Sequence, residues 1–236
     1  MKIATLNIDW AKKYKSKSHI LQIEYALVEL NADILIITES VHLNLPIYNF
    51  VYKTTEIPNK DVYEELNYSK YLNGNAAYRV SIYSKYPASK SFRVTDKHTS
   101  LAKEFETEFG TIVIYSTIIG TWFNKGPYAK EELHNCINDC MRISQQTKYF
   151  CLAGDLNTSF RNEEPEYQMP GIESRKYLKE LCKVCKLDLT TQDLEKNIDH
   201  IFISKSLKSK LNVVASSFIE KGILSDHQGV MISIQK

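Results

Sequence analysis

The sequence lacks the long apolar runs that membrane-inserted chains carry. No apolar run approaches the roughly 18 residues that a helix needs to cross a bilayer. The first ten residues, MKIATLNIDW, turn polar too early for the apolar centre of a secretory signal. We therefore expect a cytoplasmic protein with no membrane span.

Cysteine is also scarce, with only five residues, an odd number. Cys136, Cys140, Cys182 and Cys185 fall in stretches of helical periodicity, where reduced thiols pack as small apolar groups. Cys182 and Cys185 form a CxxC pair, but a zinc site usually needs a second such pair or two histidines at matching spacing, and neither follows. The sequence disfavours both a disulfide framework and a zinc or redox site.

The chain has no strong excess of one charge and no break in composition. It contains 30 Lys plus Arg and 28 Asp plus Glu, a formal charge of +2. Such a balance neither requires nor excludes a nucleic-acid partner, because a basic surface can be local. No repeat or low-complexity linker interrupts the 236 residues. We expect a single domain over residues 1–236 that acts as a monomer.

Apolar periodicity alternates between short strand-like and longer helical stretches. The predicted helices are residues 16–30, 128–143 and a segment through 177–185. The predicted strands are residues 2–8, 33–38, 78–87, 103–119, 148–155, 199–204, 212–219 and 229–235. The almost continuous apolar run at 33–38 is typical of a strand covered on both faces. The pattern predicts an α/β protein in which sheets pack face to face with helices outside.

Polar residues gather where the predicted strands end. They are Asn7, Glu39, Asp155, Asn157, Asp199, Asp226 and His227. A buried carboxylate without a partner is costly, so several acids at strand ends are best explained if they converge on a cation. Hard divalent ions such as Mg²⁺ take carboxylate oxygens and leave other positions to water and substrate phosphate.

These residue types suit hydrolysis of a phosphoester. A metal held by Glu39 would neutralise phosphoryl charge, Asp155 would orient the attacking water, and the metal or His227 would assist the leaving oxygen. Asp199 would hydrogen-bond to the imidazole of His227 and favour its protonated form. Asn7 and Asn157 suit orientation, because amides donate and accept without changing net charge.

Two neighbouring residues have alternative interpretations. His200 follows Asp199, so strand alternation points it to the opposite face, and we expect it to be structural. Asp9 shares the face of Asn7 and either joins the site or lies in a solvated loop.

The ordered segments TLNI, ITES, GDLN, IDHIFIS and SDHQGV resemble the endonuclease/exonuclease/phosphatase superfamily, which has the DNase-I-like fold. The resemblance spans residues 7–227 and implies a four-layer α/β/β/α sandwich of two mixed sheets with a Mg²⁺ or Mn²⁺ requirement. By motif, Glu39 matches the metal-binding Glu with Asn7 beside it, and Asp226 matches an acid on or near a metal. Asp155 matches the residue that activates water.

The same resemblance assigns the remaining motif positions and shows two departures. Asn157 matches the residue that holds the phosphate, and Asp199 and His227 match a pair across the site. Thr38 stands where the family often has Gln. Thr117 stands where it usually has a His or Tyr that contacts the phosphate, with Tyr115 on the same strand face.

Lys12 and Lys13 follow the Asn7 motif, where they would either contact substrate phosphates or belong to a solvated helix entry. The leading hypothesis is a metal-dependent phosphodiester hydrolase, a nuclease (endonuclease or exonuclease) that cleaves DNA. The alternatives are a phosphatase or phosphodiesterase acting on a nucleotide, inositol phosphate or lipid head group, and a catalytically idle binding module.

Overall fold

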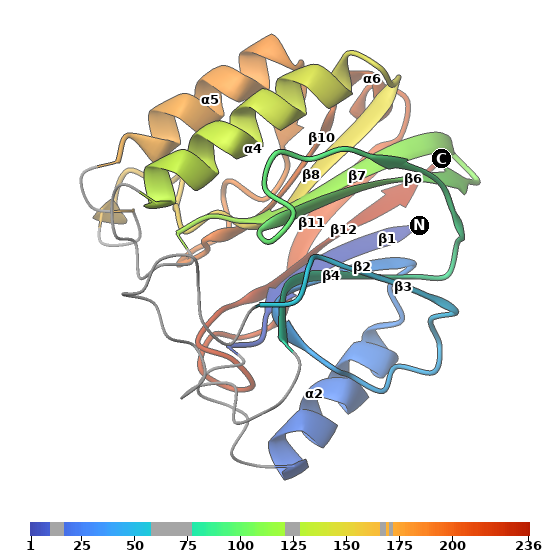
Figure 1. Cartoon of the computed structure of the whole chain (residues 1–236). Coiled ribbons are helices and arrows are strands. Elements are labelled where there is room, and N and C mark those ends of the chain that lie inside the picture. Colours follow the sequence, from blue (N-terminus) through green and yellow to red (C-terminus); the bar gives the residue numbers. More distant parts are fainter. Residues whose placement is uncertain (10–16, 58–76, 121–127, 166–168, 170–171) are drawn as a thin grey trace.

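The computed structural model describes residues 1–9, 17–57, 77–120, 128–165, 169 and 172–236. Within these residues, two six-stranded β-sheets pack face to face, and helices lie on their outer faces (Figure 1). The predicted four-layer α/β/β/α arrangement is confirmed.

The first sheet joins the two ends of the chain. Its strand order is β11 (Asn212–Ile219), β12 (Gly229–Gln235), β1 (Lys2–Asn7), β2 (Ile34–Val41), β4 (Ala77–Ser84) and β3 (Phe50–Lys53). β1 and β2 are parallel, and the other neighbours are antiparallel. Helix α2 (Lys17–Leu30) provides the crossover between β1 and β2 and covers the outer face of this sheet (Figure 1).

The second sheet is built from the middle of the chain. Its order is β5 (Ala88–Phe92), β6 (Ser100–Thr107), β7 (Gly110–Ile118), β8 (Tyr149–Asp155), β10 (Asp199–Ser204) and β9 (Leu187–Leu189). Helices α4 (Tyr128–Ser144) and α5 (Ser174–Val184) cover its outer face, and the short helix α6 (Lys205–Lys208) follows β10 (Figure 1).

Alternation along the strands separates three buried clusters. In β2, Ile34 and Ile36 face the second sheet, whereas Leu35 and Ile37 pack under α2. In β8, Cys151 and Ala153 face the first sheet, while Phe150 and Leu152 pack under α4 and α5. The continuous apolar run in β2 therefore reflects burial on both faces, as predicted.

The structure differs from the strand predictions in several places. The single run predicted at 103–119 is two strands, because β6 and β7 form a hairpin whose turn ends at Gly110, with φ +104°. The edge strands β3, β5 and β9 were not predicted, because they are short and few of their residues are buried, so burial gives them little apolar periodicity.

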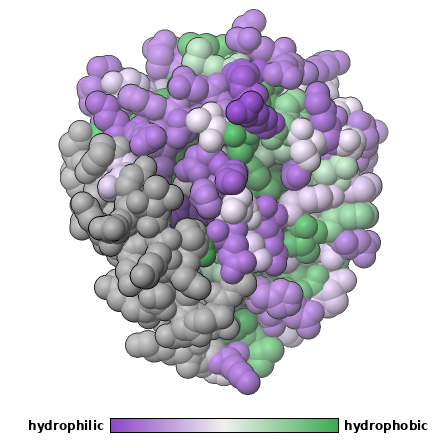
Figure 2. All heavy atoms as spheres, in the orientation of Figure 1, coloured by the Kyte–Doolittle hydropathy of each residue, from purple (hydrophilic) through white to green (hydrophobic). Residues whose placement is uncertain are grey.

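The polarity of the surface and the state of the cysteines match what the composition predicts. In the view of Figure 2, the part that the structure describes is mainly hydrophilic, and hydrophobic residues appear as separate patches. All five cysteines are free. Among the described helices, none is both long and apolar enough to cross a membrane.

Candidate active site

Strand alternation brings the predicted catalytic side chains to one end of the space between the sheets. Asp155 ends β8 on the same face as Ala153, and Asp199 begins β10 on the same face as Ile201. Asp199 lies directly opposite Asp155 in the antiparallel β8–β10 pair, so their side chains project to the same side. Asn7 ends β1 on the facing sheet.

Two asparagines hold the carboxylate of Asp155. Nδ2 of Asn7 donates to Oδ2 at 2.9 Å, across the two sheets. The backbone N–H of Asn157 donates to Oδ1 at 2.9 Å, and its Nδ2 donates to Oδ2 at 3.1 Å. Burial raises the pKa of Asp155 to about 7, with His227 lowering it and Asp199 raising it. A carboxyl group with a pKa near neutrality suits proton transfer from water.

His227 and Asp199 form a close pair. The distance between Nδ1 of His227 and Oδ2 of Asp199 is 2.7 Å. Burial lowers the pKa of His227, but Asp199 and Asp155 outweigh it and raise the pKa to about 10. The ring is therefore a cation at neutral pH, and its Nε2 is the nitrogen left for an anionic substrate.

Two buried polar residues that the sequence reasoning missed support this pair. Oγ of Ser225 donates to the carbonyl of Asn7 at 2.6 Å and accepts from the backbone N–H of His227 at 3.1 Å. The side chain of Asn197 binds both the backbone N–H and the carbonyl of Asp199. Ser225 lies two residues before His227, and Asn197 lies two residues before Asp199. This spacing is typical of local turns in which a Ser or Asn side chain binds the backbone, and it could have indicated both residues from the sequence.

Glu39 occupies a strained position within β2. Its φ is +47°, and the β2–β4 pairing passes from Thr38 to Ser40 without it, although the register is the same on both sides. Glu39 alone therefore departs from the strand conformation. Burial raises the pKa of Glu39 to about 8; His227 lowers it, and Asp155, Asp9 and Asp226 raise it. Glu39 therefore lies within electrostatic reach of His227 and of Asp155.

The donor set fits a hard divalent cation. Potential ligand atoms of Asp155, Asp199 and His227 lie within 4.8 Å of one another. Because the protonated ring of His227 has no free lone pair, the carboxylates of Asp155 and Asp199 are the donors that suit a cation here. Oδ1 of Asp199 is buried and has no hydrogen-bond partner among the described residues. Burial, with a smaller contribution from neighbouring acids, raises the pKa of Asp155 and Glu39, and a cation beside these carboxylates would stabilise their charged forms. Carboxylate oxygens are the ligands that Mg²⁺ or Mn²⁺ prefers.

The predicted metal ligands correspond only in part to this acidic cluster. The prediction named Glu39, Asp226 and Asn7, whereas the tight group comprises Asp155, Asp199 and His227. Glu39 and Asp226 lie close enough to contribute charge. Asn7 contacts Asp155 through its amide nitrogen, and its Oδ1 accepts a hydrogen bond from the backbone N–H of Asp9.

The GDLN segment owes its shape to two backbone positions. Gly154 has φ +142°, and a Cβ there would lie 1.9 Å from the carbonyl oxygen of Thr117, so β7 and β8 can approach only at a glycine. Asn157 has φ +47°, a conformation that asparagine tolerates better than most residues. This geometry turns Asn157 back onto Asp155.

His200 is structural, as predicted. It is fully buried on the face opposite Asp199; Nε2 donates to the carbonyl of Thr158 at 2.9 Å, and Nδ1 lies 3.0 Å from Oγ1 of Thr191. Burial lowers its pKa to about 4, so the ring is neutral. Asp9, by contrast, is 5% exposed and its backbone N–H binds Oδ1 of Asn7, which places it at the site rather than in a solvated loop.

The structure places Thr117 and Tyr115, which were predicted to contact substrate, away from the acidic cluster. Tyr115 is fully buried with Phe150 under α4, and the hydroxyl of Thr117 lies 2.8 Å from that of Ser100. The two residues do share a face, but it is the helix-covered face, whereas the site lies on the other face of β7. The predicted phosphate contacts Lys12 and Lys13 lie outside the described residues.

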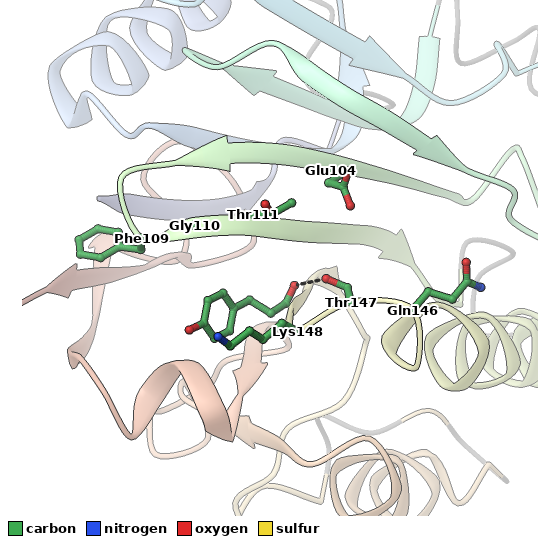
Figure 3. A pocket seen from close by; sticks show the side chains of 8 residues that line it. Glu104, Phe109, Gly110, Thr111, Gln146, Thr147 and Lys148 are labelled. Carbon is green, nitrogen blue, oxygen red and sulfur yellow. Dashed lines mark hydrogen bonds between the residues drawn. The ribbon is translucent and has the colours of Figure 1, made fainter.

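A separate pocket of about 430 Å³ lies at the opposite end of β8, near Tyr149 (Figure 3). Its polar side chains are engaged: Thr111 donates to Glu106, Thr147 donates to the carbonyl of Tyr149, and Gln146 donates to a backbone carbonyl of α4. The pocket shows no set of convergent groups that would select a ligand.

Comparison with known proteins gives a consistent pattern. The family model described as Endonuclease/Exonuclease/phosphatase family matches residues 4–227. An endonuclease/exonuclease/phosphatase structure from Beutenbergia cavernae is similar at 14% identity and a TM-score of 0.67, covering 100% of this chain and 71% of that chain. No curated protein matches the sequence at a significant level.

Two structures from Neisseria are similar over the whole length of both chains. One is a 3′–5′ exonuclease from Neisseria meningitidis, at 14% identity and a TM-score of 0.67, with 100% of each chain covered. The other is a 3′ phosphatase bound to a product DNA hairpin, with the same identity, TM-score and coverage. At this identity the likeness shows the fold.

Proposed function

The chain belongs to the endonuclease/exonuclease/phosphatase family, whose members hydrolyse phosphoester bonds, and we propose that it is a divalent-metal-dependent nuclease that cleaves DNA. The observation that carries the proposal is the convergence of Asp155 with the Asp199–His227 pair at one end of the sandwich. In this proposal the protein acts as a monomer in the cytoplasm.

Each group has a place in hydrolysis. Asp155, held by Asn7 and Asn157, accepts a proton as water attacks phosphorus. The His227 imidazolium, held by Asp199, donates a hydrogen bond to a phosphate oxygen.

The acidic cluster also has a place for a metal. Glu39 and Asp226, with Oδ1 of Asp199, would hold Mg²⁺ or Mn²⁺. When bound, such an ion neutralises phosphoryl charge and stabilises the leaving oxygen.

The DNA assignment draws support from the similar structures. One is named as an exonuclease and another carries a product DNA hairpin. Both structures carry the same protein name, NExo, and the second is named as a 3′ phosphatase. A phosphatase acting on a phosphorylated nucleotide or DNA end is therefore the second candidate. A binding module without catalysis would need neither the water-activating Asp155 nor the Asp199–His227 pair.

The test is cleavage of supercoiled plasmid with Mg²⁺ or Mn²⁺. We expect nicking that disappears with a chelator and falls at least about 100-fold in Asp155→Ala and in His227→Ala. Matched controls are Asp193→Asn and His134→Ala at exposed positions, which should cleave like the wild type.

The outcomes separate the candidates. Cleavage that persists unchanged in both site variants would refute the site assignment. Failure to cleave plasmid, with release of phosphate from a 3′-phosphorylated oligonucleotide that both variants lose, would select the phosphatase.

A further inference from the structure

A buried acid on α4 contacts the loop that follows β7. Glu132 is 5% exposed, and its Oε2 accepts a hydrogen bond from the backbone N–H of Gly120 at 2.6 Å. A buried carboxylate is costly unless it is well paired, and a charge-assisted bond of this length is a strong one.

The same peptide unit binds the candidate active site. The N–H of Gly120 and the carbonyl of Ile119 belong to one planar trans peptide, so they point in opposite directions. The Ile119 carbonyl accepts from Nδ2 of Asn157 at 2.7 Å. Glu132 therefore binds one end of a peptide whose other end binds Asn157.

The orientation of Asn157 depends on that carbonyl. Nδ2 has two hydrogens, and its two acceptors are the Ile119 carbonyl and Oδ2 of Asp155. Because both partners are acceptors, the atom that faces them must be the amide nitrogen of Asn157, and its Oδ1 points away from them. If the Ile119–Gly120 peptide rotated, its N–H would face Asn157 and the amide would lose this acceptor.

Gly120 has φ +84°, a conformation that glycine adopts without strain, and glycine also tolerates the backbone angles that a rotated peptide would need. We propose that Glu132 is a positioning residue that locks the Ile119–Gly120 peptide and thereby orients Asn157 against Asp155. This role rests on the proposed phosphoester hydrolysis, in which Asn157 acts on the reacting groups.

Packing of α4 does not require the acid. The apolar side chains Leu133, Cys136, Cys140 and Ile143 already bury the inner face of the helix. An acid at position 132 adds the cost of burial, and its bond to Gly120 contributes to offsetting that cost.

The test compares Glu132→Ala with Glu132→Gln, whose side-chain carbonyl can still accept from Gly120. We expect kcat to fall about 10–100-fold in Glu132→Ala, as is usual when support of a site residue is lost, and to stay within about threefold in Glu132→Gln. The matched control is Glu131→Ala, one residue earlier and exposed, which should behave like the wild type.

A double-mutant cycle separates positioning from general destabilisation. If Glu132 acts through Asn157, Glu132→Ala should lower kcat no further in an Asn157→Ala background. A purely structural role predicts equal losses in both backgrounds and would overturn the inference. Should Glu132→Ala not fold, Glu132→Met replaces it, because it fills the space without a comparable acceptor.

An activity-independent measurement distinguishes failure of this inference from failure of the proposed function. In ¹⁵N-labelled protein, we expect the Gly120 amide and the Asn157 side-chain NH₂ signals to shift together in Glu132→Ala and to stay in place in Glu131→Ala. Such shifts in a protein with no phosphoesterase activity would refute the function and retain the positioning. Unmoved Asn157 signals would refute the positioning.

Discussion

The Asp199–His227 pair allows a quantitative test. The change is Asp199→Asn, which keeps the shape of the side chain and removes its charge 2.7 Å from Nδ1 of His227. Two unit charges at this distance attract by about 6 kcal/mol at an effective dielectric constant of 20. Measured effects of one adjacent opposite charge are smaller, about 1–3 pKa units, because the partly exposed ring is also hydrated.

We therefore expect Asp199→Asn to lower the pKa of His227 by about two, which corresponds to about 3 kcal/mol. In the metal-free wild type the pKa of His227 is about 10, against an ordinary value of 6.5 for histidine. A cation whose folded-state pKa is raised stabilises the fold fully below pH 6.5 and loses this effect as the pH rises through 10. In Asp199→Asn the loss should therefore occur at a pH about two units lower.

The assay has two readouts, both with a chelator present. NMR titration of the His227 Cε1–H signal should give a pKa about two units lower in Asp199→Asn. Urea denaturation should show the variant less stable by about 3 kcal/mol at pH 6, with the difference vanishing above pH 10. The control is Asp193→Asn, the same chemical change at an exposed position. Identical titrations, or a stability difference that does not depend on pH, would refute the reasoning.

Three further predictions concern single positions. Gly154→Ala should lower the free energy of unfolding, measured by urea denaturation, by at least about 3 kcal/mol, because the new Cβ would meet the Thr117 carbonyl. Gly222→Ala should lower it by only about 1 kcal/mol, because Gly222 also has a positive φ, +92°, but has nothing within 4 Å. Equal losses in the two variants would contradict this reasoning. His200 has a folded-state pKa of about 4, against an ordinary value of 6.5, so the free energy of unfolding of the wild type should fall by up to about 3 kcal/mol between pH 6.5 and pH 4. In His200→Gln, the free energy of unfolding should depend less on pH over this range. Glu39→Gln should weaken Mn²⁺ binding at least about 10-fold by calorimetry with little loss of melting temperature, and unchanged binding would exclude Glu39 as a ligand.

Strand alternation shows how far prediction from sequence could go. It correctly separated Asp199 from His200, because adjacent residues of a strand always face opposite sides. The same rule grouped Thr117 with Tyr115, but alternation does not say which of two faces meets a site. The structure places both residues on the face of β7 that α4 covers, which the sequence could not decide.

Local geometry accounts for other differences. Glu39 was identified by its motif, but its φ of +47° departs from strand geometry, so no periodicity argument could give the direction of its side chain. Ser225 and Asn197 act through bonds to the backbone, and such roles are visible only when the backbone partner is placed. In the sequence, Glu132 is one of several acids on a predicted helix, and nothing distinguishes it from its neighbour Glu131. The structure distinguishes it, because Glu132 accepts a hydrogen bond from Gly120.

The sequence by itself determined the alternating elements, the two-sheet layering and the chemical nature of the site, because burial periodicity and residue type are local properties of the chain. Only the tertiary structure decided which groups meet. Asn7 binds Asp155 across 148 positions, and Ser225 binds Asn7 across 218. Contacts at such separations depend on how two sheets register against each other, and no local pattern in the chain encodes that register.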